Sequence, residues 1–204
     1  MKTQTKLTQD TLTPKTAHAI LVAGNKRFVE NLKTQRNLQE QVLETSKGQY
    51  PFAVILSCID SRVPAELVFD QGIGDIFSVR VAGNIINPDI LGSMEYACKV
   101  AGSKIVVVMG HSKCGAVTAA CNHVTLGNIT SLLQKIKPAV DLISNGNKKM
   151  SDKDIENVAI QNVILSIERI RQESPILKEM EDNDEIEIVG AVYSVSTGEV
   201  SFFD

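Results

Sequence analysis

Three short apolar runs lie in the first 110 residues, at 53–58, 76–81 and 105–109. Each run is nearly all apolar, and the third is rich in β-branched residues. Runs of this kind predict strands that are buried on both faces of a sheet. The segments between the runs are long enough to be crossover helices, so we expect a mainly parallel sheet.

Helical patterns occupy the segments between and after these strands. They are predicted at 64–69, 87–101, 115–121, 129–143 and 155–170. Gly102 ends the second of these helices, and Ser151 with Asp154 resembles a capping box before the last one. Residues 185–195 and 199–203 flank a Ser-Thr-Gly turn, so they predict a strand and a hairpin return.

The amino-terminal residues divide into two parts. Residues 1–13 are polar and predict a mobile tail, so ordered structure should begin near Pro14. From Pro14 to Leu32, apolar residues recur at helical intervals after a Thr-Pro start, which predicts an amphipathic helix. Its apolar face is expected to pack on its own domain or on a partner. Residues 14–204 are predicted to form a single α/β domain.

Composition narrows the class of protein. The 204 residues suffice for one domain, and 43% hydrophobic with 22% charged residues is typical of globular proteins. The net charge is -3, and basic residues are scattered among acidic ones, which argues against nucleic acid as a partner. No signal-peptide pattern or long apolar run is present, so we expect a cytoplasmic protein without a membrane span. The four cysteines are then expected to be thiols or metal ligands.

Three of the chemically reactive residues follow strands. His111 and Cys114 lie where the third strand runs into a helix, and Cys58 ends the first strand. Because parallel strands end at the same edge of a sheet, the three side chains should converge there. Two thiolates and an imidazole favour Zn²⁺, and three protein ligands leave the open fourth position of a catalytic site.

Two alternatives to an open zinc site remain. The three residues would be ordinary packing groups if they did not converge. Cys121, seven residues after Cys114, would instead complete a closed structural site. The other cysteine and histidines are assigned to a helix core or to the solvated surface: Cys98, His18 and His123.

A carboxylate and a guanidinium group follow Cys58 closely. Asp60 would lie near the metal, and Arg62 would hold its carboxylate in a bidentate pair. Asp60 should then stay ionised and accept a hydrogen bond from zinc-bound hydroxide. The alternative is a surface ion pair worth at most about 1 kcal/mol. Two thiolates offset the metal charge, so the site is expected to favour alkaline conditions.

The motifs CIDSR at 58–62 and HSKCG at 111–115 together resemble those of the β-class carbonic anhydrases. The resemblance implies a lyase that reversibly hydrates carbon dioxide to bicarbonate and a proton, with one zinc per chain held by Cys58, His111 and Cys114. It implies a parallel sheet of four strands plus an edge strand, flanked by helices. It also implies that the amino-terminal helix embraces a partner in a homodimer or homotetramer.

Further positions extend the resemblance into the substrate pocket. Gln49 matches the substrate-orienting glutamine of the plant-like branch, and Phe77 and Tyr96 match apolar pocket residues. Gly115 matches the residue whose backbone N–H faces the substrate oxygen. The branch with an allosteric bicarbonate pocket has a tryptophan where this chain has Ile55, and the chain contains no tryptophan. No such bicarbonate switch is therefore expected.

Two other functions are compatible with the same fold. Relatives of the family hydrolyse carbonyl sulfide or carbon disulfide, and only access to the pocket separates these substrates from carbon dioxide. A non-catalytic zinc-binding or bicarbonate-binding protein is the other alternative. The presence of Asp60, Arg62 and Gln49 favours turnover.

Overall fold

The computed structural model describes residues 3–144, 146 and 149–203. In this part of the chain, one five-stranded sheet has the order β2-β1-β3-β4-β5. The strands are β1 Ala53–Ser57, β2 Ile76–Arg80, β3 Ile105–His111, β4 Glu187–Tyr193 and β5 Val200–Phe203. β1 to β4 are parallel, whereas β5 runs antiparallel to β4. The predicted sheet of four parallel strands with one further edge strand is confirmed.

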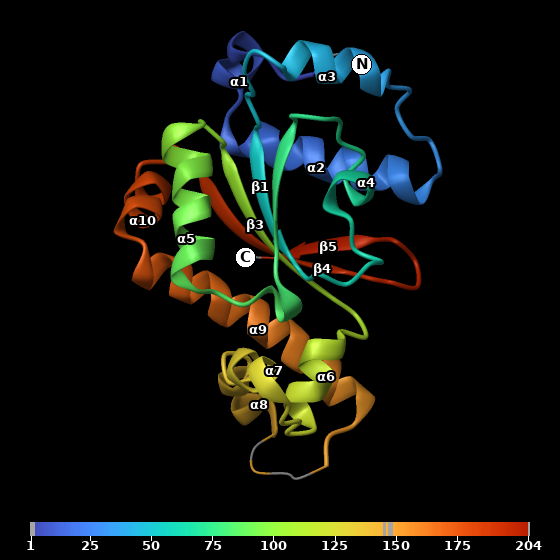
Figure 1. Cartoon of the computed structure of the whole chain (residues 1–204), viewed down its shortest axis with the longest axis vertical. Helices are drawn as coiled ribbons and strands as arrows, with labels where there is room; N and C mark the ends of the chain where they lie inside the picture. The colour runs from blue at the N-terminus through green and yellow to red at the C-terminus, as the bar shows by residue number, and fades with distance from the viewer. Residues whose placement is uncertain (1–2, 145, 147–148, 204) are drawn as a thin grey trace.

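Helices cover both faces of this sheet (Figure 1). They are α1 Lys6–Thr11, α2 Pro14–Val29, α3 Leu38–Thr45, α4 Ala65–Val68, α5 Pro88–Glu95, α6 Gly115–Cys121, α7 Gly127–Leu133, α8 Lys137–Ser144, α9 Asp152–Glu173 and α10 Pro175–Asp182, with a 3₁₀ turn at Ala82–Asn84 and a π-helix at Tyr96–Val100. Among the described helices, none combines the length and apolar character needed to cross a membrane.

The apolar runs of the sequence form the middle of three layers. Val54 and Leu56 of β1 point to one face, where they pack with apolar residues of α5, α9 and α10. Ile55 points to the other face, which is covered by α2 and α4. Strands buried on both faces explain why these runs are nearly all apolar rather than alternating.

Helix α2 packs on its own sheet. Thr13 caps its first turn and Pro14 occupies the first helical position, where a missing N–H costs nothing. Ala17 and Leu21 are wholly buried in the same cluster as Ile55. Part of the apolar face therefore packs on the domain of the same chain, whereas Val22 and Leu32 are exposed in the single chain.

A further group of helices lies beyond the carboxyl-terminal end of β3. α6, α7 and α8 pack there against the amino-terminal part of α9, at the bottom of Figure 1. Cys58 and Cys114 are members of this cluster. This group of helices therefore packs against the edge of the sheet where the predicted metal ligands lie.

Ordered structure begins before Pro14, so the expected start of regular structure is wrong. Thr5 caps α1 through a capping box with Thr8. Gln9 is buried, and its Nε2 donates hydrogen bonds to the carbonyl oxygens of Pro51 at 2.8 Å and Ala101 at 2.7 Å. Because a polar residue anchors this segment, the apolar periodicity of the sequence does not reveal it.

The helix predicted over 129–143 is wrong as a single element, because the structure has α7 and α8 there. Pro138 lies at the second position of α8, and proline cannot continue a preceding helix because it lacks the N–H. The capping box of Ser151 and Asp154 and the helix end at Gly102, whose φ is 85°, are confirmed. Helices α3 and α10 were not predicted.

Candidate metal centre

Two cysteines and one histidine converge at the carboxyl-terminal edge of the sheet. Cys58 directly follows β1, and His111 is the last residue of β3, the parallel neighbour of β1. Cys114 immediately precedes α6. One ligand atom from each residue lies within 4.8 Å of the other two, and all three residues are buried. Cys121 is not in this described cluster, so the four-ligand alternative is wrong.

The His111 ring is oriented for metal binding. Its Nδ1 lies 2.9 Å from the carbonyl oxygen of Ser112, an acceptor, so Nδ1 carries the proton. Its Nε2 is buried and has no hydrogen-bond partner in the described part of the chain. An unpaired buried nitrogen is costly. A metal bound at Nε2 would satisfy this atom, and two sulfur donors beside it suit Zn²⁺.

The two thiols of the cluster are electrostatically unequal. A hydrogen bond with the Cys114 thiol holds the pKa of Cys58 well below its usual range, although burial opposes this shift. The N–H of Gly83, 3.3 Å from Cys58 Sγ, lowers the pKa of Cys58 further. The same hydrogen bond and burial raise the pKa of Cys114. A divalent cation that binds both sulfurs would displace the remaining thiol protons.

Asp60 and Arg62 form a two-pronged ion pair beside the cluster. Arg62 Nε donates to Asp60 Oδ1 at 2.9 Å, and Arg62 Nη2 donates to Asp60 Oδ2 at 2.7 Å. The Arg62 backbone N–H also donates to Oδ1, at 3.0 Å. The Arg62 side chain therefore holds the pKa of the Asp60 carboxyl well below its usual range. Asp60 is an ionised acceptor whose orientation is fixed.

Arg80, which is not among the predicted site residues, holds the backbone of the same loop. It is the last residue of β2, the strand beside β1. Its Nε donates to the carbonyl oxygen of Cys58 at 3.0 Å and its Nη2 to that of Asp60 at 2.6 Å. Its place at the carboxyl end of a predicted strand could have marked Arg80 as a site residue, because the carboxyl ends of parallel strands meet at one edge of the sheet.

The loop between His111 and Cys114 is held from three sides. Lys113 has a φ of 54°, a left-handed conformation that is uncommon for a residue with a side chain. Its N–H donates to Glu156 of α9 at 2.8 Å, and its carbonyl oxygen accepts from Arg62 at 3.3 Å. The Ser112 N–H donates to the Tyr193 carbonyl oxygen of β4 at 2.9 Å. The neighbouring elements thus stabilise an unusual backbone between two ligands.

The residues expected in the substrate pocket are divided between the two ends of the sheet. Gly115 follows Cys114 directly and begins α6. Phe77 pairs with Val54, four residues before Cys58, and a strand rise of about 3.3 Å per residue separates these levels by about 13 Å. Tyr96 lies with Phe77, their ring centroids 6.2 Å apart in an edge-on arrangement. These rings line an open depression of about 670 Å³.

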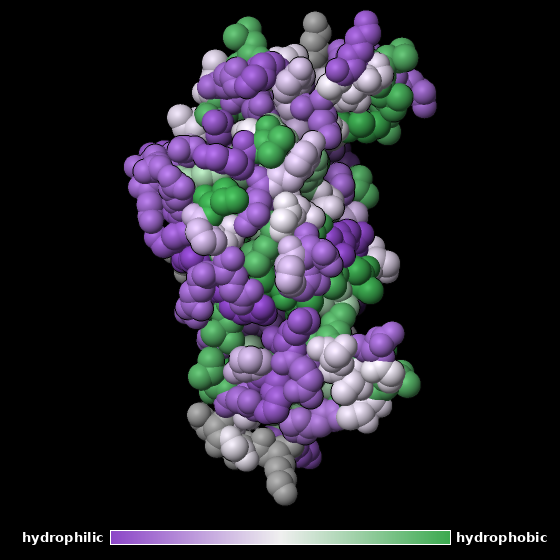
Figure 2. All heavy atoms as spheres, turned by 60° about the vertical axis from the view of Figure 1, so that its left-hand side comes forward, coloured by the Kyte–Doolittle hydropathy of each residue, from purple (hydrophilic) through white to green (hydrophobic). Residues whose placement is uncertain are grey.

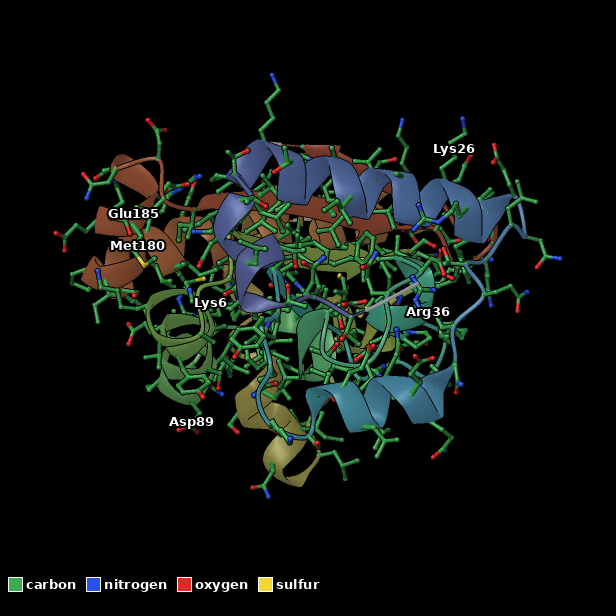
Figure 3. The ribbon with its side chains drawn as sticks, turned by 90° about the horizontal axis from the view of Figure 1, so that it is seen from above. Lys6, Lys26, Arg36, Asp89, Met180 and Glu185 are labelled. Atoms are coloured by element: carbon green, nitrogen blue, oxygen red, sulfur yellow. The ribbon has the colours of Figure 1, made fainter. Side chains whose placement is uncertain are left out.

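Gln49 also lies away from the cysteine and histidine cluster along the chain path. It is exposed in the loop that leads into β1, so it lies near the end of the strand opposite to Cys58. Helices α1 and α3 lie over this amino-terminal end of the sheet (Figure 3). Within one chain, Gln49, Phe77 and Tyr96 are therefore not brought together with the predicted metal ligands.

Known proteins share these features of sequence and fold. The family model described as carbonic anhydrase matches residues 53–200. Carbonic anhydrase 2 of Mycobacterium tuberculosis is 36% identical over 192 residues, which cover 91% of this chain and 90% of that protein. The carbonic anhydrase of Mycolicibacterium smegmatis is 32% identical over 194 residues, 92% of each chain.

Solved structures agree with the sequence comparisons. The β-carbonic anhydrase CafA of Aspergillus fumigatus has a TM-score of 0.74 and 27% identity, covering 93% of this chain and 91% of that one. This chain belongs to the β-carbonic anhydrase family. A chain from the crystal structures of two tetrameric β-carbonic anhydrases of Sordaria macrospora has the same fold, with a TM-score of 0.72 at 22% identity, covering 93% of this chain and 97% of that one.

Membership of the β-carbonic anhydrase family confirms the resemblance carried by CIDSR and HSKCG, and with it the expectation of an enzyme. The assignment to the plant-like branch, which depends on Gln49, stays a prediction. His18 is corrected: it was expected to be solvated, but it packs on Phe202 and lies 3.2 Å from Glu187. Cys98 is buried in the core, as expected.

Proposed function

We propose that this β-carbonic anhydrase reversibly hydrates carbon dioxide to bicarbonate and a proton, with one zinc ion per chain held by Cys58, His111 and Cys114. The observation that supports this most directly is the buried cluster of two thiols and an unpaired imidazole nitrogen. Zinc, when bound, supplies a Lewis acid that lowers the pKa of water toward about 7 in favourable sites. The cytoplasmic location stays a prediction.

The protein groups around the cluster have separate roles in this proposal. Asp60 is the fixed acceptor that orients the nucleophile, because its carboxylate is ionised and both of its oxygens are held by Arg62. Arg62 does not need to touch the substrate for this role. The backbone N–H of Gly115, beside Cys114, is the proposed donor to the substrate oxygen.

The proposed pocket is completed by a second copy of the chain. Gln49, Phe77 and Tyr96 lie toward the amino-terminal end of the sheet, whereas the metal cluster lies at the other end. If they orient carbon dioxide, as the family resemblance implies, they must do so at the metal cluster of another copy. A homodimer or homotetramer is proposed for this reason, and the tetrameric relatives of Sordaria macrospora support it.

Metal removal tests the proposed activity. We expect the chelator-treated protein to lose carbon dioxide hydration in stopped-flow measurements and to regain it with one equivalent of Zn²⁺ per chain. Cys58→Ser should bind no zinc and stay inactive, because one of three ligands is lost. Cys98→Ser, at a buried cysteine outside the cluster, is the matched control and should keep both zinc and activity.

Other outcomes of the same experiment select the alternatives. Zinc bound at one per chain without hydration of carbon dioxide would contradict the proposal and favour a binding protein. Faster turnover of carbonyl sulfide or carbon disulfide than of carbon dioxide would assign the site to those substrates. Full activity after complete removal of the metal would exclude the zinc centre.

A further inference from the structure

Helix α9 reaches the metal centre through a buried amide. We propose that Asn162 is a positioning residue that holds Gly83 so that the Gly83 N–H donates to the Cys58 sulfur and limits how strongly that thiolate donates charge to the metal. The proposal rests on the proposed zinc site. It assigns a function to a residue that lies 79 positions from Gly83 in the sequence and acts through the Gly83 backbone.

Two hydrogen bonds in series connect Asn162 to the cluster. Asn162 Nδ2 donates to the carbonyl oxygen of Gly83 at 2.8 Å, and Asn162 is only 3% exposed. The N–H of the same glycine donates to Cys58 Sγ at 3.3 Å. Both contacts are buried, so water does not readily replace either partner. The glycine is therefore held at its carbonyl by α9 while its N–H contacts the sulfur.

The backbone at Gly83 needs this support. Its φ of 68° and ψ of 20° are left-handed, a conformation that glycine adopts without a steric penalty. A Cβ at this position would lie 2.6 Å from Cδ1 of Ile136. Because glycine is also the most flexible residue, its own conformational preference does not restrain the turn. The Asn162 amide supplies a restraint from outside the turn.

The N–H···S contact has a chemical consequence for a metal ligand. A hydrogen bond to a thiolate stabilises negative charge on the sulfur, so less of that charge is donated to the cation. The same N–H also fixes the position of the sulfur, and loss of a partner that orients a ligand typically lowers metal affinity by about 10- to 100-fold. A change at Asn162 should therefore alter the electronic properties of the cluster as well as the stability of the fold.

The test compares two buried asparagines that both donate to backbone carbonyls. Asn162→Leu removes the donor with little change in volume. Asn25→Leu is the matched control, because Asn25 Nδ2 donates to the carbonyl oxygens of Val68 and Gly198, which are outside the metal loops. Each full-length variant is loaded with Co²⁺ for absorption spectroscopy, and its zinc affinity is measured by chelator competition.

We expect Asn162→Leu to move the thiolate-to-cobalt charge-transfer bands to longer wavelength and to weaken zinc binding by about 10-fold, the lower end for such partners. Asn25→Leu should lower the melting temperature but leave both metal readouts unchanged. Asn162→Ser, whose hydroxyl is too short to replace the amide, gives a smaller change to the core and should show the same band shift.

Unchanged bands and unchanged zinc affinity in the Asn162 variants would overturn the proposal and leave Asn162 a purely structural residue. Equal shifts in the Asn25 control would also overturn it, because the effect would then be general to the fold. Wild-type protein that shows no thiolate-to-cobalt bands would instead contradict the zinc site itself. The failure of this inference is thus distinguishable from the failure of the proposed function.

Discussion

At the scale of single residues, the site depends on how rigidly Asp60 is held. Its two carboxylate oxygens receive three hydrogen bonds from Arg62, and Arg80 binds the carbonyl oxygens of Cys58 and Asp60. A carboxylate fixed in this way needs little reorganisation to orient a reacting group. Asp60 is therefore expected to affect turnover far more than metal binding.

Asp60→Asn tests this separation. The amide keeps the shape of the side chain but loses the charge and one acceptor oxygen, so we expect kcat/KM for carbon dioxide to fall by about 100-fold, at the low end for proton-handling groups. Zinc content should stay at one per chain. Stopped-flow hydration and metal analysis measure the two quantities. Asp141→Asn, at an exposed residue paired with Lys137, is the control.

A loss of zinc in the Asp60→Asn protein would contradict this role, because Asp60 would then be needed to hold the metal. Wild-type turnover in the variant would leave the Asp60–Arg62 pair as the surface ion pair considered in the sequence analysis. A marked fall of activity in the Asp141→Asn control would show that the assay responds to any lost surface charge.

The sequence allowed the convergence of three side chains to be predicted, but not the residues that support them. Cys58, His111 and Cys114 each follow a strand or precede a helix, and apolar runs reveal strand ends. Asn162 and Glu156 act across 79 and 43 residues of sequence, from within a helix whose pattern only shows which face is buried. Such contacts depend on the packing of α9, which no local pattern specifies.

At the scale of elements, a buried ion pair fastens the segment after α2 to the end of α4. Asp70 accepts hydrogen bonds from Arg27 Nε and Arg36 Nη1, both at 2.6 Å, and from the Thr34 hydroxyl at 2.8 Å. Arg36 lies at the side of the molecule between α2 and α3 (Figure 3). Burial tends to raise the pKa of Asp70, but the two arginines and Thr34 outweigh it and lower the pKa to about 2.

Stability should depend on pH through Asp70. Its pKa is lower in the folded chain than the usual value of about 3.9, so its contribution is complete above about pH 4 and is lost as the pH falls through about 2. Asp70→Asn should lower the free energy of unfolding at pH 7 by about 3 kcal/mol, because two arginines lose their shared carboxylate. Denaturant unfolding at several pH values measures both effects.

The difference between wild type and Asp70→Asn should shrink as the pH approaches 2. A difference that stays constant from pH 7 to pH 2 would show that the charge of Asp70 does not stabilise the fold. Asp182→Asn is the control, since Asp182 is an exposed partner of Lys178. An exposed pair of this kind contributes about 0.5 kcal/mol at most.

At this scale, the sequence predicted most elements that have apolar periodicity. It missed α1 and α3, which are held by polar contacts, and also the short helix α10, whose Leu177 and Met180 pack in the apolar core. The strand runs and α9 were found because their buried faces are apolar. α1 depends on Gln9, and α3 begins at a cap formed by Asn37, so neither has a strong apolar pattern. Pro138 divided one predicted helix into two, although its position was visible in the sequence.

At the scale of the whole molecule, the separation of the two groups of site residues predicts a shared site. The face that carries α5 and α10 is largely hydrophilic, with hydrophobic side chains in small groups (Figure 2). Tyr96, which follows α5, is 52% exposed in the single chain. Exposure of an aromatic pocket residue is consistent with a partner that covers it.

Mixed oligomers test whether the site is shared. The Cys58→Ser variant is expected to bind no metal. The kcat/KM of the Gln49→Ala variant should fall about tenfold, because one hydrogen bond to the substrate is lost. If a second copy supplies Gln49, a dimer of one chain of each variant has one intact site, because the Cys58→Ser chain provides its Gln49 to the metal cluster of the Gln49→Ala chain. Such hybrids can be isolated by co-expressing the two variants with different tags. They should recover roughly half of the wild-type activity per dimer. Stopped-flow hydration of the purified hybrid measures this recovery.

A hybrid of Cys58→Ser with Asp60→Asn is the matched control. Both changes affect groups that one chain supplies to its own metal cluster, so no intact site forms and no recovery is expected. Recovery in both hybrids, or in neither, would contradict a site shared between copies. Elution of the wild-type protein as a clean monomer in gel filtration would contradict it as well.

The pairing of β1 with β3 sets the order in which the centre matures during synthesis. Pairing of these two parallel strands brings Cys58 and His111 together, and a nascent chain that ends before residue 114 holds no complete set of the three residues. Glu156 and Asn162, which steady the ligand loops, are made later still. The contacts from α9 can therefore form only after all three residues of the cluster have been synthesised.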